Sequence, residues 1–307
     1  MIRMNNRDIT GVLVVDKSKG PTSHDIIASL RRVLQMRRIG HCGTLDPLAS
    51  GVLVVCLGNY TRLNRWLSHA DKEYNATLCL GATSVTGDAQ GPIAESSGYT
   101  IPDASVVAEK LRVFCGEIEQ VPHAYSAIKV DGVRSYNKAR RGEEVELKAR
   151  RINIYQLELV SYEFPKLVIR VHCSSGTYIR SLAADLGASL GVGAYLAELQ
   201  RTRVGQLGLD RALTLDSIAT MREKGNIEDA FAHPREALGE FASIELNKDR
   251  LVDFTHGKSI EDLPSPVADA EKPCAVFDAS ENLYGIAHWD KGALRPFCVL
   301  RQTLLVA

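Results

Sequence analysis

The sequence predicts a mixed α and β fold (α+β) in which a large domain is followed by a small β-rich one. Strand-like and helix-like hydrophobic patterns both occur along about the first 240 residues, and the length of 307 residues exceeds that of one minimal domain. The pattern also changes near residue 240, where breakers interrupt it. We therefore expect one domain over residues 1–240 and a second over residues 241–307.

The N-terminal part is predicted to contain a strand, a capped helix and a second strand. Residues 11–15 are strand-like, and Pro21-Thr22-Ser23 supplies an N-cap for a helix. The apolar residues of this helix follow helical spacing: Ile26, Ile27, Leu30, Val33 and Leu34. Residues 51–57 form a uniformly apolar run typical of a buried strand, and residues 62–67 are predicted to be helical.

Both periodicities continue through the middle of the chain. Alternation predicts strands whose inner faces carry Tyr74, Ala76, Leu78 and Leu80, and Leu167, Ile169, Val171 and Cys173. Helical spacing relates Val106, Val107, Leu111 and Phe114, and also Ile179, Leu182, Ala183 and Leu186. The large domain should therefore combine a sheet with packed helices.

Residues 126–151 are polar, basic and poor in large aliphatic side chains. Because such a segment adds little to a core, we expect it to project as an inserted arm. Near residue 240, His233-Pro234 and Gly239 break the pattern, and strand-like segments follow at 274–277 and 283–287.

The formal net charge of zero hides an uneven distribution of charge. Residues 1–70 carry ten Lys/Arg against four Asp/Glu, and residues 129–151 carry eight against four. Residues 243–307 carry seven against ten. Positive charge thus gathers in the first half, which suits local contact with a polyanion. Arg31, Arg32, Arg37 and Arg38 form either a solvated helix face or a phosphate contact.

No apolar stretch approaches the roughly 20 residues that cross a bilayer, and no charged leader with an apolar run opens the sequence, so we expect a cytoplasmic protein. The seven cysteines are scattered through apolar segments without Cys-x-x-Cys spacing. We expect them to be reduced core residues rather than metal ligands or a redox pair.

Residues 40–48, Gly-His-Cys-Gly-Thr-Leu-Asp-Pro-Leu, are the segment with the clearest chemical signal. An Asp-Pro step is usually a turn. Here, however, Asp46 follows two closely spaced glycines and precedes an apolar strand, so its carboxylate is predicted to sit on a pinned loop at the edge of a core. Such rigid placement suits nucleophilic or acid–base work.

Around this loop the sequence resembles the TruB family of bacterial tRNA pseudouridine synthases, which isomerise a uridine in the T loop (position 55) of transfer RNA. The resemblance spans roughly residues 11–205. Besides residues 40–48, it rests on Val15-Asp16-Lys17 with Gly20 and Thr22-Ser23, Lys72-Glu73-Tyr74, Gly87-Asp88 before Gly91, Tyr125-Ser126-Ala127 with Lys129, Ser175-Gly176-Thr177-Tyr178-Ile179-Arg180, and Leu199 with Arg201-Thr202-Arg203.

The resemblance implies roles for a central group of residues. Asp46 would be the nucleophile, Tyr74 the aromatic ring that stacks on the target base, and Arg180 the cation that pairs with Asp46. Asp88 would engage Arg180 from its other side. A neighbouring guanidinium favours the charged form of an aspartate that burial would otherwise neutralise. Taken alone, Tyr74 would be interpreted as a sheet residue with its hydroxyl at the surface.

The resemblance implies further substrate contacts as well. Tyr178 and Leu199 would line the pocket, although each alone would be interpreted as a core residue. His41 would fill or read the space vacated by the target nucleotide, which must be flipped out of its stack. Its alternative is a loop histidine bonded to backbone. The implied substrate is the T-arm stem-loop, and neither a cofactor nor a protein partner is expected.

The C-terminal 65 or so residues resemble, more weakly, the small RNA-binding β domain called PUA. Lys258, Lys291 and Arg295 are its candidate RNA contacts, and a packing module is the alternative. The chain departs from the family at Cys42 and at His123, where a second proline commonly follows Pro122. Cys42 is expected to be a buried thiol.

Two other function classes compete with the isomerase. A non-catalytic tRNA-binding or chaperone protein of the same fold would not need Asp46, yet this chain retains Asp46, Tyr74 and Arg180 together. A metal-dependent hydrolase using Asp46 and His41 lacks a third ligand at useful spacing. For the isomerase, attack of Asp46 on the sugar C1′, attack on the base, and an elimination remain open.

Overall fold

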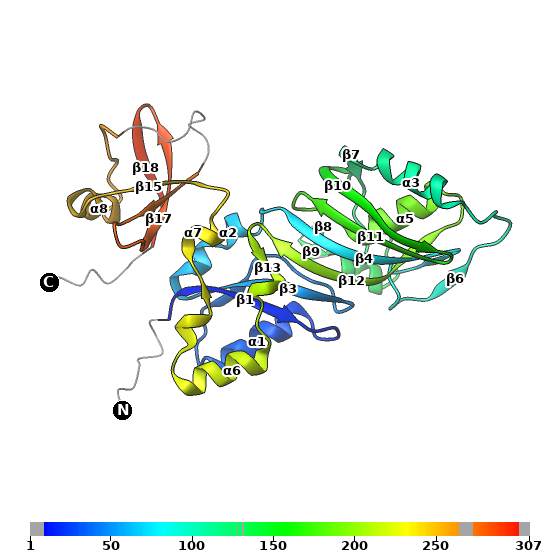
Figure 1. Ribbon diagram of the computed structural model, residues 1–307, viewed down its shortest axis with the longest axis horizontal. Helices are drawn as coiled ribbons and strands as arrows, with labels where there is room; N and C mark the ends of the chain where they lie inside the picture. Colours follow the sequence, from blue (N-terminus) through cyan, green and yellow to red (C-terminus); the bar gives the residue numbers. More distant parts are fainter. Residues whose placement is uncertain (1–8, 127, 131, 264–272, 301–307) are drawn as a thin grey trace.

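A ten-stranded sheet forms the centre of the large domain in the computed structural model, which describes residues 9–300 apart from 127, 131 and 264–272 (Figure 1). Its strand order is β14 (Phe231–Ala232), β1 (Gly11–Lys17), β3 (Ala49–Leu57), β12 (Ala194–Val204), β4 (Lys72–Leu80), β11 (Lys166–Cys173), β10 (Arg150–Glu163) and β7 (Gly116–Gln120), with β2 (Ile39–His41) on β3 and β13 (Leu207–Gly208) on β12. Strands β3 and β12 are parallel, whereas the other neighbours are antiparallel. The predicted mixed α and β class is confirmed.

The strands follow the burial that their sequences predict. Strand β4 alternates between buried and half-buried residues, so that Tyr74, Ala76, Leu78 and Leu80 share its inner face. Strand β3 is buried almost throughout, because both of its faces are covered. Its odd-numbered residues Leu53 and Val55 belong to one core cluster, whereas Val52 and Val54 belong to another.

Helix α1 (Ser23–Val33) begins at the predicted cap. The Thr22 hydroxyl accepts a hydrogen bond from Asp25 N–H, and the Asp25 carboxylate accepts one from Thr22 N–H, which together form a capping box. Helices α1 and α6 (Leu215–Lys224) cover the first half of the sheet. Their buried contacts include Ile26, Ile27 and Leu30 of α1 and Ile218 of α6.

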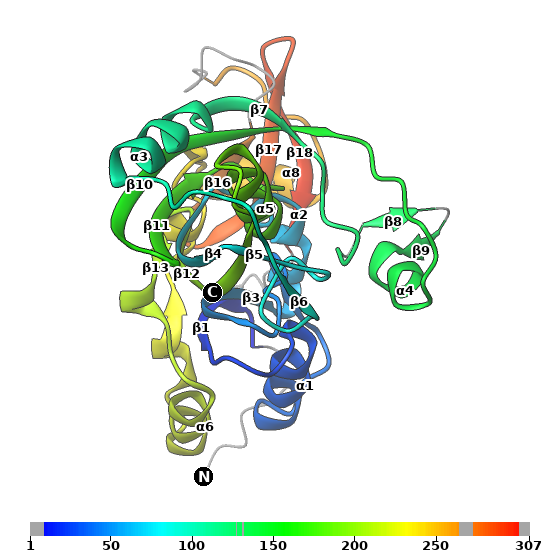
Figure 2. The ribbon, with the colours of Figure 1, turned by 90° about the vertical axis from the view of Figure 1, so that its right-hand side faces the viewer.

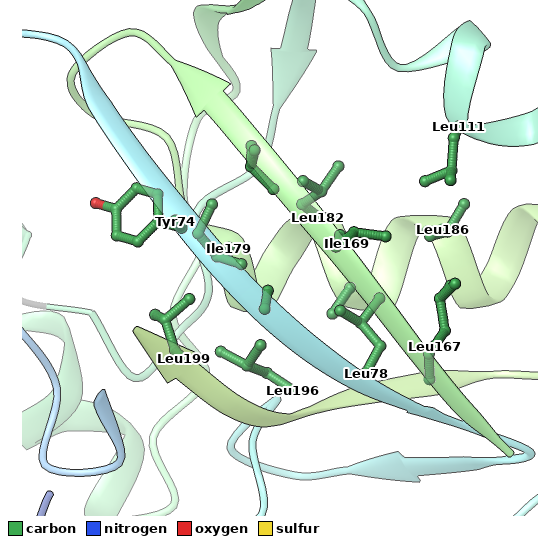
Figure 3. Packing of buried hydrophobic residues seen from close by; sticks show 14 of the residues in the cluster. Tyr74, Leu78, Leu111, Leu167, Ile169, Ile179, Leu182, Leu186, Leu196 and Leu199 are labelled. Carbon is green, nitrogen blue, oxygen red and sulfur yellow. The ribbon is translucent and has the colours of Figure 1, made fainter. Parts of the chain in front are cut away.

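Helices α3 (Ala104–Val113) and α5 (Ile179–Ser189) cover the second half of the sheet. The apolar face of α5 packs against the inner face of β4 and β11 (Figure 3). The shorter elements are η1 (Gly58–Leu63), α2 (Asn64–Leu67), β5 (Ala82–Ser84), β6 (Ile93–Glu95), η2 (Leu209–Arg211), η3 (Ile227–Ala230) and α7 (Pro234–Ala237).

Strands β3 and β12 pair over only three residues, Ala49 to Gly51, and this short junction joins the two halves of the sheet. Gly51 has a φ of +97°, and a Cβ on it would lie 2.2 Å from the Arg201 carbonyl oxygen. Any other residue would therefore push the two strands apart. The loop that carries Asp46 enters β3 at this junction.

The described residues of the segment 126–149 project from the sheet as a small lobe (Figure 2). In its described part the lobe contains β8 (Lys129–Val130), β9 (Val133–Arg134) and α4 (Ser135–Arg140). Arg150 and Arg151, which we had included in the predicted arm, pair with Gln120 and Glu119 as the first residues of β10. They therefore belong to the sheet and not to the projection.

A four-stranded sheet follows near the C-terminus, in the order β15 (Ala242–Glu245), β16 (Cys274–Phe277), β17 (Leu283–Asp290) and β18 (Ala293–Val299), with helix α8 (Lys248–Thr255). Its residues Phe277, Leu283 and Ile286 share a core cluster with Val54 of β3. An Arg62 Nη1–H donates to the Val299 carbonyl. The small sheet is thus packed on the large domain through apolar and polar contacts.

All seven cysteines have free thiols, but they are not all core residues as the sequence had suggested. Cys115 is exposed, because the chain turns there from α3 into β7, and Cys79 is half-buried. The other five are buried. Among the helices in the described ranges, none is both long and apolar enough to span a membrane.

Candidate active site

Asp46 lies on the loop between β2 and β3, and hydrogen bonds fix this loop on both sides of it. The Ser23 hydroxyl at the start of α1 donates to the Leu45 carbonyl at 3.1 Å and accepts from Leu45 N–H at 2.8 Å. Gly20 N–H donates to the Pro47 carbonyl at 2.8 Å. The carboxylate is therefore held on a rigid support, as the sequence had predicted.

Two buried cations, Lys17 and Arg201, donate hydrogen bonds to backbone carbonyls on either side of Asp46. The Lys17 ammonium group donates to the Ala49 carbonyl at 2.5 Å, and Arg201 donates from Nη2 to the Gly43 carbonyl at 3.2 Å. Both side chains are almost wholly buried. Burial lowers the pKa of Lys17 to about 8, although the negative charge of Asp46 opposes the shift. These buried cations thereby supply hydrogen-bond donors to the Ala49 and Gly43 carbonyls.

Arg180 of α5 joins the loop to a second acidic residue. Its Nη2 lies 3.0 Å from Asp46 Oδ2, and its Nη1 lies 3.7 Å from Asp88 Oδ2. Two carbonyls complete its surroundings, because Nη1 donates to Thr86 O at 3.1 Å and Nη2 donates to Tyr125 O at 2.9 Å. The structure thus brings together the acid, the arginine and the second acid that the resemblance had implied.

Competing effects act on the Asp46 carboxyl group. Burial raises its pKa above the ordinary value, and the charge of Asp88 adds to this effect. Arg180 and, more weakly, Lys17 lower it. Desolvation is the largest of these effects, so Arg180 offsets the pKa rise only in part. Arg180 favours the ionised form of Asp46, as expected, but burial has the larger effect and keeps the pKa of Asp46 above its ordinary value.

Two hydrogen bonds fix the first turn of α5. The side-chain amide of Gln120 accepts from Tyr178 N–H at 2.8 Å and donates to the Tyr178 carbonyl at 3.1 Å. Gln120 is buried at the end of β7. Because Arg180 stands two residues beyond Tyr178, these hydrogen bonds also fix the backbone from which the Arg180 side chain extends. Tyr178 itself is half-buried, and burial raises the pKa of its phenol, whereas the charges of Arg150 and Arg180 oppose the rise and that of Asp46 adds a small contribution to it.

Tyr74 stands at the margin of the core and not at the surface (Figure 3). Its hydroxyl points away from the other labelled residues, and Leu199 and Ile179 lie nearest to its ring in this view. Burial raises the pKa of the phenol, whereas Arg201 beside it lowers the pKa. The interpretation of Tyr74 as a residue with a surface hydroxyl was therefore wrong, and Leu199 is buried in the same cluster.

His41 lies at the end of β2, and its ring meets His24 of α1 edge to face, with 5.5 Å between ring centres. Burial lowers the pKa of His41, and the nearby His24 and Arg201 lower it further. Within the described part of the chain, no hydrogen bond or ion pair joins His41 to Asp46 or Arg180. The structure brings His41 to the loop but not into that pair.

Arg38 and Arg31, two of the four basic residues before the loop, make hydrogen bonds that support the fold. Arg38 donates to Asn59 and Thr61, and Arg31 donates to the Ile39 carbonyl. Arg37 is exposed. Both the solvated face and the phosphate contact remain compatible with this arrangement.

Cys42 is fully buried, as we had expected. Its sulfur lies 3.5 Å from the Cys56 sulfur and 3.3 Å from the Asn64 side-chain oxygen. The hydrogen bond with Cys42 and burial raise the pKa of Cys56 well above its usual value, which makes Cys56 a poor source of thiolate.

Periodicity alone did not single out Lys17, Arg201 or Gln120. A lysine at the end of an apolar strand is ordinarily interpreted as marking where that strand reaches solvent. The available signal for Lys17 and Arg201 was the resemblance, which rests in part on Val15-Asp16-Lys17 and Arg201-Thr202-Arg203. In the structure Arg201 of β12 pairs directly with Tyr74 of β4 and so shares its face.

Two family models match consecutive parts of the chain. The model described as TruB family pseudouridylate synthase (N terminal domain) matches residues 31–179, and the tRNA pseudouridylate synthase B C-terminal domain matches residues 180–238. A tRNA pseudouridine synthase B from Burkholderia mallei is 42% identical over 96% of this chain and 95% of its own. One from Leifsonia xyli is 42% identical over 90% of this chain and 92% of its own.

Solved structures agree with these sequence matches. The crystal structure of a Cbf5-Nop10-Gar1 complex contains a chain that superimposes with a TM-score of 0.72 at 27% identity, over 91% of this chain and 78% of that one. A chain of an H/ACA RNP bound to a substrate RNA has the same fold, with a TM-score of 0.73 at 24% identity, over 95% of this chain and 85% of that one. From the relatives and the family models, the chain belongs to the TruB family of pseudouridylate synthases.

Proposed function

We propose that this protein isomerises a uridine in the T loop of transfer RNA, at position 55, to pseudouridine. The observation that carries the proposal is the pairing of Asp46, on a pinned loop, with the buried Arg180 at 3.0 Å. Relatives that share 42% of the sequence over nearly the whole chain are tRNA pseudouridine synthases B, which supports the same substrate.

The chemistry explains why one carboxylate is the central group. The bond from C1′ to N1 must break, and the base must turn and reattach through C5, so the product has the same atoms as the substrate. A stacked base cannot make this turn, and the nucleotide must therefore be flipped out. Asp46 would act on the flipped nucleotide by attack on C1′, by attack on the base, or by starting an elimination.

The remaining residues would bind and orient the substrate. Tyr74 would stack on the base, with Leu199 and Tyr178 as walls of its pocket, and His41 would occupy the space that the base leaves. Arg180, held by Asp88, would stabilise the negative form of Asp46. These roles fit the burial of Tyr74 and Leu199 beside the loop.

We also propose that residues 1–240 are the catalytic domain and residues 241–307 a PUA-like RNA-binding domain. Of its candidate contacts, Lys258 pairs with Asp253 at 2.7 Å and Arg295 pairs with Asp290 at 3.0 Å. Such pairing reduces their attraction for phosphate and leaves Lys291 as the stronger candidate. The protein would act on transfer RNA in the cytoplasm without a protein partner.

Replacing Asp46 by Asn tests the assignment directly, because the amide keeps the shape and removes the charge. Pseudouridine formation on a T-arm stem-loop should fall by at least about 10³-fold, whereas the dissociation constant for the RNA should change little. Nucleoside chromatography after digestion measures the product. Asp185→Asn, which alters an exposed acid on the same helix as Arg180, is the matched control.

The same experiment separates catalysis from the alternative of a tRNA chaperone. If the protein were only a chaperone, the wild type would form no pseudouridine, and the Asp46→Asn variant would bind RNA as well as the wild type. Product from the wild type and none from the Asp46→Asn variant would leave the enzyme as the explanation, and undiminished product from that variant would contradict it.

A further inference from the structure

Two hydrogen bonds link His123, through the turn of residues 123–125, to Arg180. His123 Nδ1 accepts a hydrogen bond from Tyr125 N–H at 3.2 Å. The carbonyl of the same Tyr125 accepts from Arg180 Nη2 at 2.9 Å. That nitrogen also lies 3.0 Å from Asp46 Oδ2. The imidazole therefore fixes the peptide that orients the arginine opposite the proposed nucleophile.

The His123 ring also packs on the second segment that holds the guanidinium. Gly87 has a φ of +73°, and a Cβ on it would lie 2.8 Å from His123 Cδ2 and 2.9 Å from Nε2. The preceding residue, Thr86, gives its carbonyl to Arg180 Nη1 at 3.1 Å. One side chain thus contacts both backbone segments whose carbonyls anchor Arg180.

We propose that His123 is a positioning residue for Arg180. Its Nδ1 holds the turn that presents the Tyr125 carbonyl, and its ring braces the Gly87 segment that presents the Thr86 carbonyl. Arg180 needs both carbonyls because two carboxylates alone leave its remaining N–H groups without acceptors in a buried site. The inference rests on the proposed function, since the arginine matters only if Asp46 is the reacting group.

The chemistry of the imidazole supports this role. To accept at Nδ1, the ring must be neutral and carry its proton on Nε2. Burial lowers the pKa of His123 to about 4, with a further contribution from the Arg180 charge that Asp88 opposes. At neutral pH the ring is therefore an acceptor, and it adds no positive charge beside the guanidinium.

A ring that merely fills space would behave differently from a ring that positions Arg180. A filler needs volume and no acceptor, so phenylalanine would replace it well. A positioning group needs an acceptor attached to Cγ, as in asparagine, whose Oδ1 occupies the corresponding place in an Asx turn. Asp88 in this protein makes such a turn, because its Oδ1 accepts from Gln90 N–H at 3.0 Å.

The test compares His123→Asn, His123→Phe and His123→Ala in the full-length protein. The single-turnover rate on a T-arm stem-loop should stay within about threefold of wild type for Asn and fall about tenfold or more for Phe and Ala, as expected for one lost hydrogen bond. The RNA dissociation constants and the urea denaturation midpoints of the Asn and Phe variants should be alike. If His123 had only a structural role, its replacement would change these two quantities and not the rate.

His233→Phe is the matched control. His233 Nδ1 likewise accepts a hydrogen bond from the N–H group two residues later, that of Arg235, at 3.3 Å. His233, however, is the N-cap of α7. Its removal should leave the rate unchanged.

A wild-type rate for His123→Phe, or an equal loss in the Asn and Phe variants, would overturn the inference. A wild-type protein that forms no pseudouridine would instead overturn the proposed function, so the two failures are distinguishable.

Discussion

Arg180 and Asp46 form an ion pair with unequal burial: the arginine side chain is 8% exposed and the aspartate side chain 38%. The cation is fixed by the protein, whereas the acid keeps an open side. A substrate can therefore approach the carboxylate without displacing its partner. In such an arrangement the guanidinium is already oriented toward the carboxylate before the substrate binds.

Replacing Asp88 by Asn should shift the acid limb of the pH–rate profile. Asp88 is a negative charge that raises the pKa of Asp46, so its removal should favour ionised Asp46 and lower that pKa. Activity lost on acidification should then be lost at lower pH than in the wild type. Single-turnover rates between pH 4 and pH 8, with Asp185→Asn as control, measure the shift. A shift to higher pH would show that the sign is wrong.

Tyr74 should tolerate loss of its hydroxyl better than loss of its ring. In Tyr74→Phe the stacking surface remains, whereas in Tyr74→Leu it is lost, and base–aromatic stacking is worth about 1–3 kcal/mol. The Phe variant should keep most of the single-turnover rate, and the Leu variant should lose about tenfold or more. Comparable rates for both variants would remove stacking as the reason for the tyrosine.

Arg201→Leu should destabilise the fold through unpaired carbonyls. Arg201 donates to Val52 O at 2.7 Å and to Gly43 O at 3.2 Å, and each carbonyl left unsatisfied costs about 1–3 kcal/mol. Urea denaturation should show a lower free energy of unfolding. Arg203→Leu is the control on the same strand, because its ion pair with Glu73 is half-exposed and should contribute at most about 1 kcal/mol. Equal losses would argue against a special role for Arg201.

Binding of transfer RNA should weaken steeply with salt despite the neutral net charge, because phosphate contacts release counterions. If Arg37 makes one such contact, Arg37→Ala should reduce the slope of log K against log salt by about 1. Arg170→Ala, which removes an arginine already paired with Glu158 at 3.1 Å, is the control. A dissociation constant independent of salt would contradict the basic-face model.

Several elements could be predicted because their burial is one-sided and local. Strand β4 alternates cleanly, and the Thr22–Asp25 capping box starts α1 at the predicted place. The end of the arm could not be predicted, because Arg150 and Arg151 are polar residues on an exposed part of β10. Their strand conformation comes from pairing with β7, which no local pattern reveals.

The sequence by itself determined the mixed α and β class, several of its strands and helices, the family, and the loop that carries Asp46. Tertiary structure decided which groups surround that acid. Lys17 and Arg201 are buried where they donate to carbonyls of the loop and of β3, and Arg180 meets the Tyr125 carbonyl on a turn that His123 holds. Such contacts depend on residues far apart in the chain coming within about 3 Å. Local propensity and periodicity describe only neighbours along the sequence, so they set the elements, whereas packing set the electrostatics of the site.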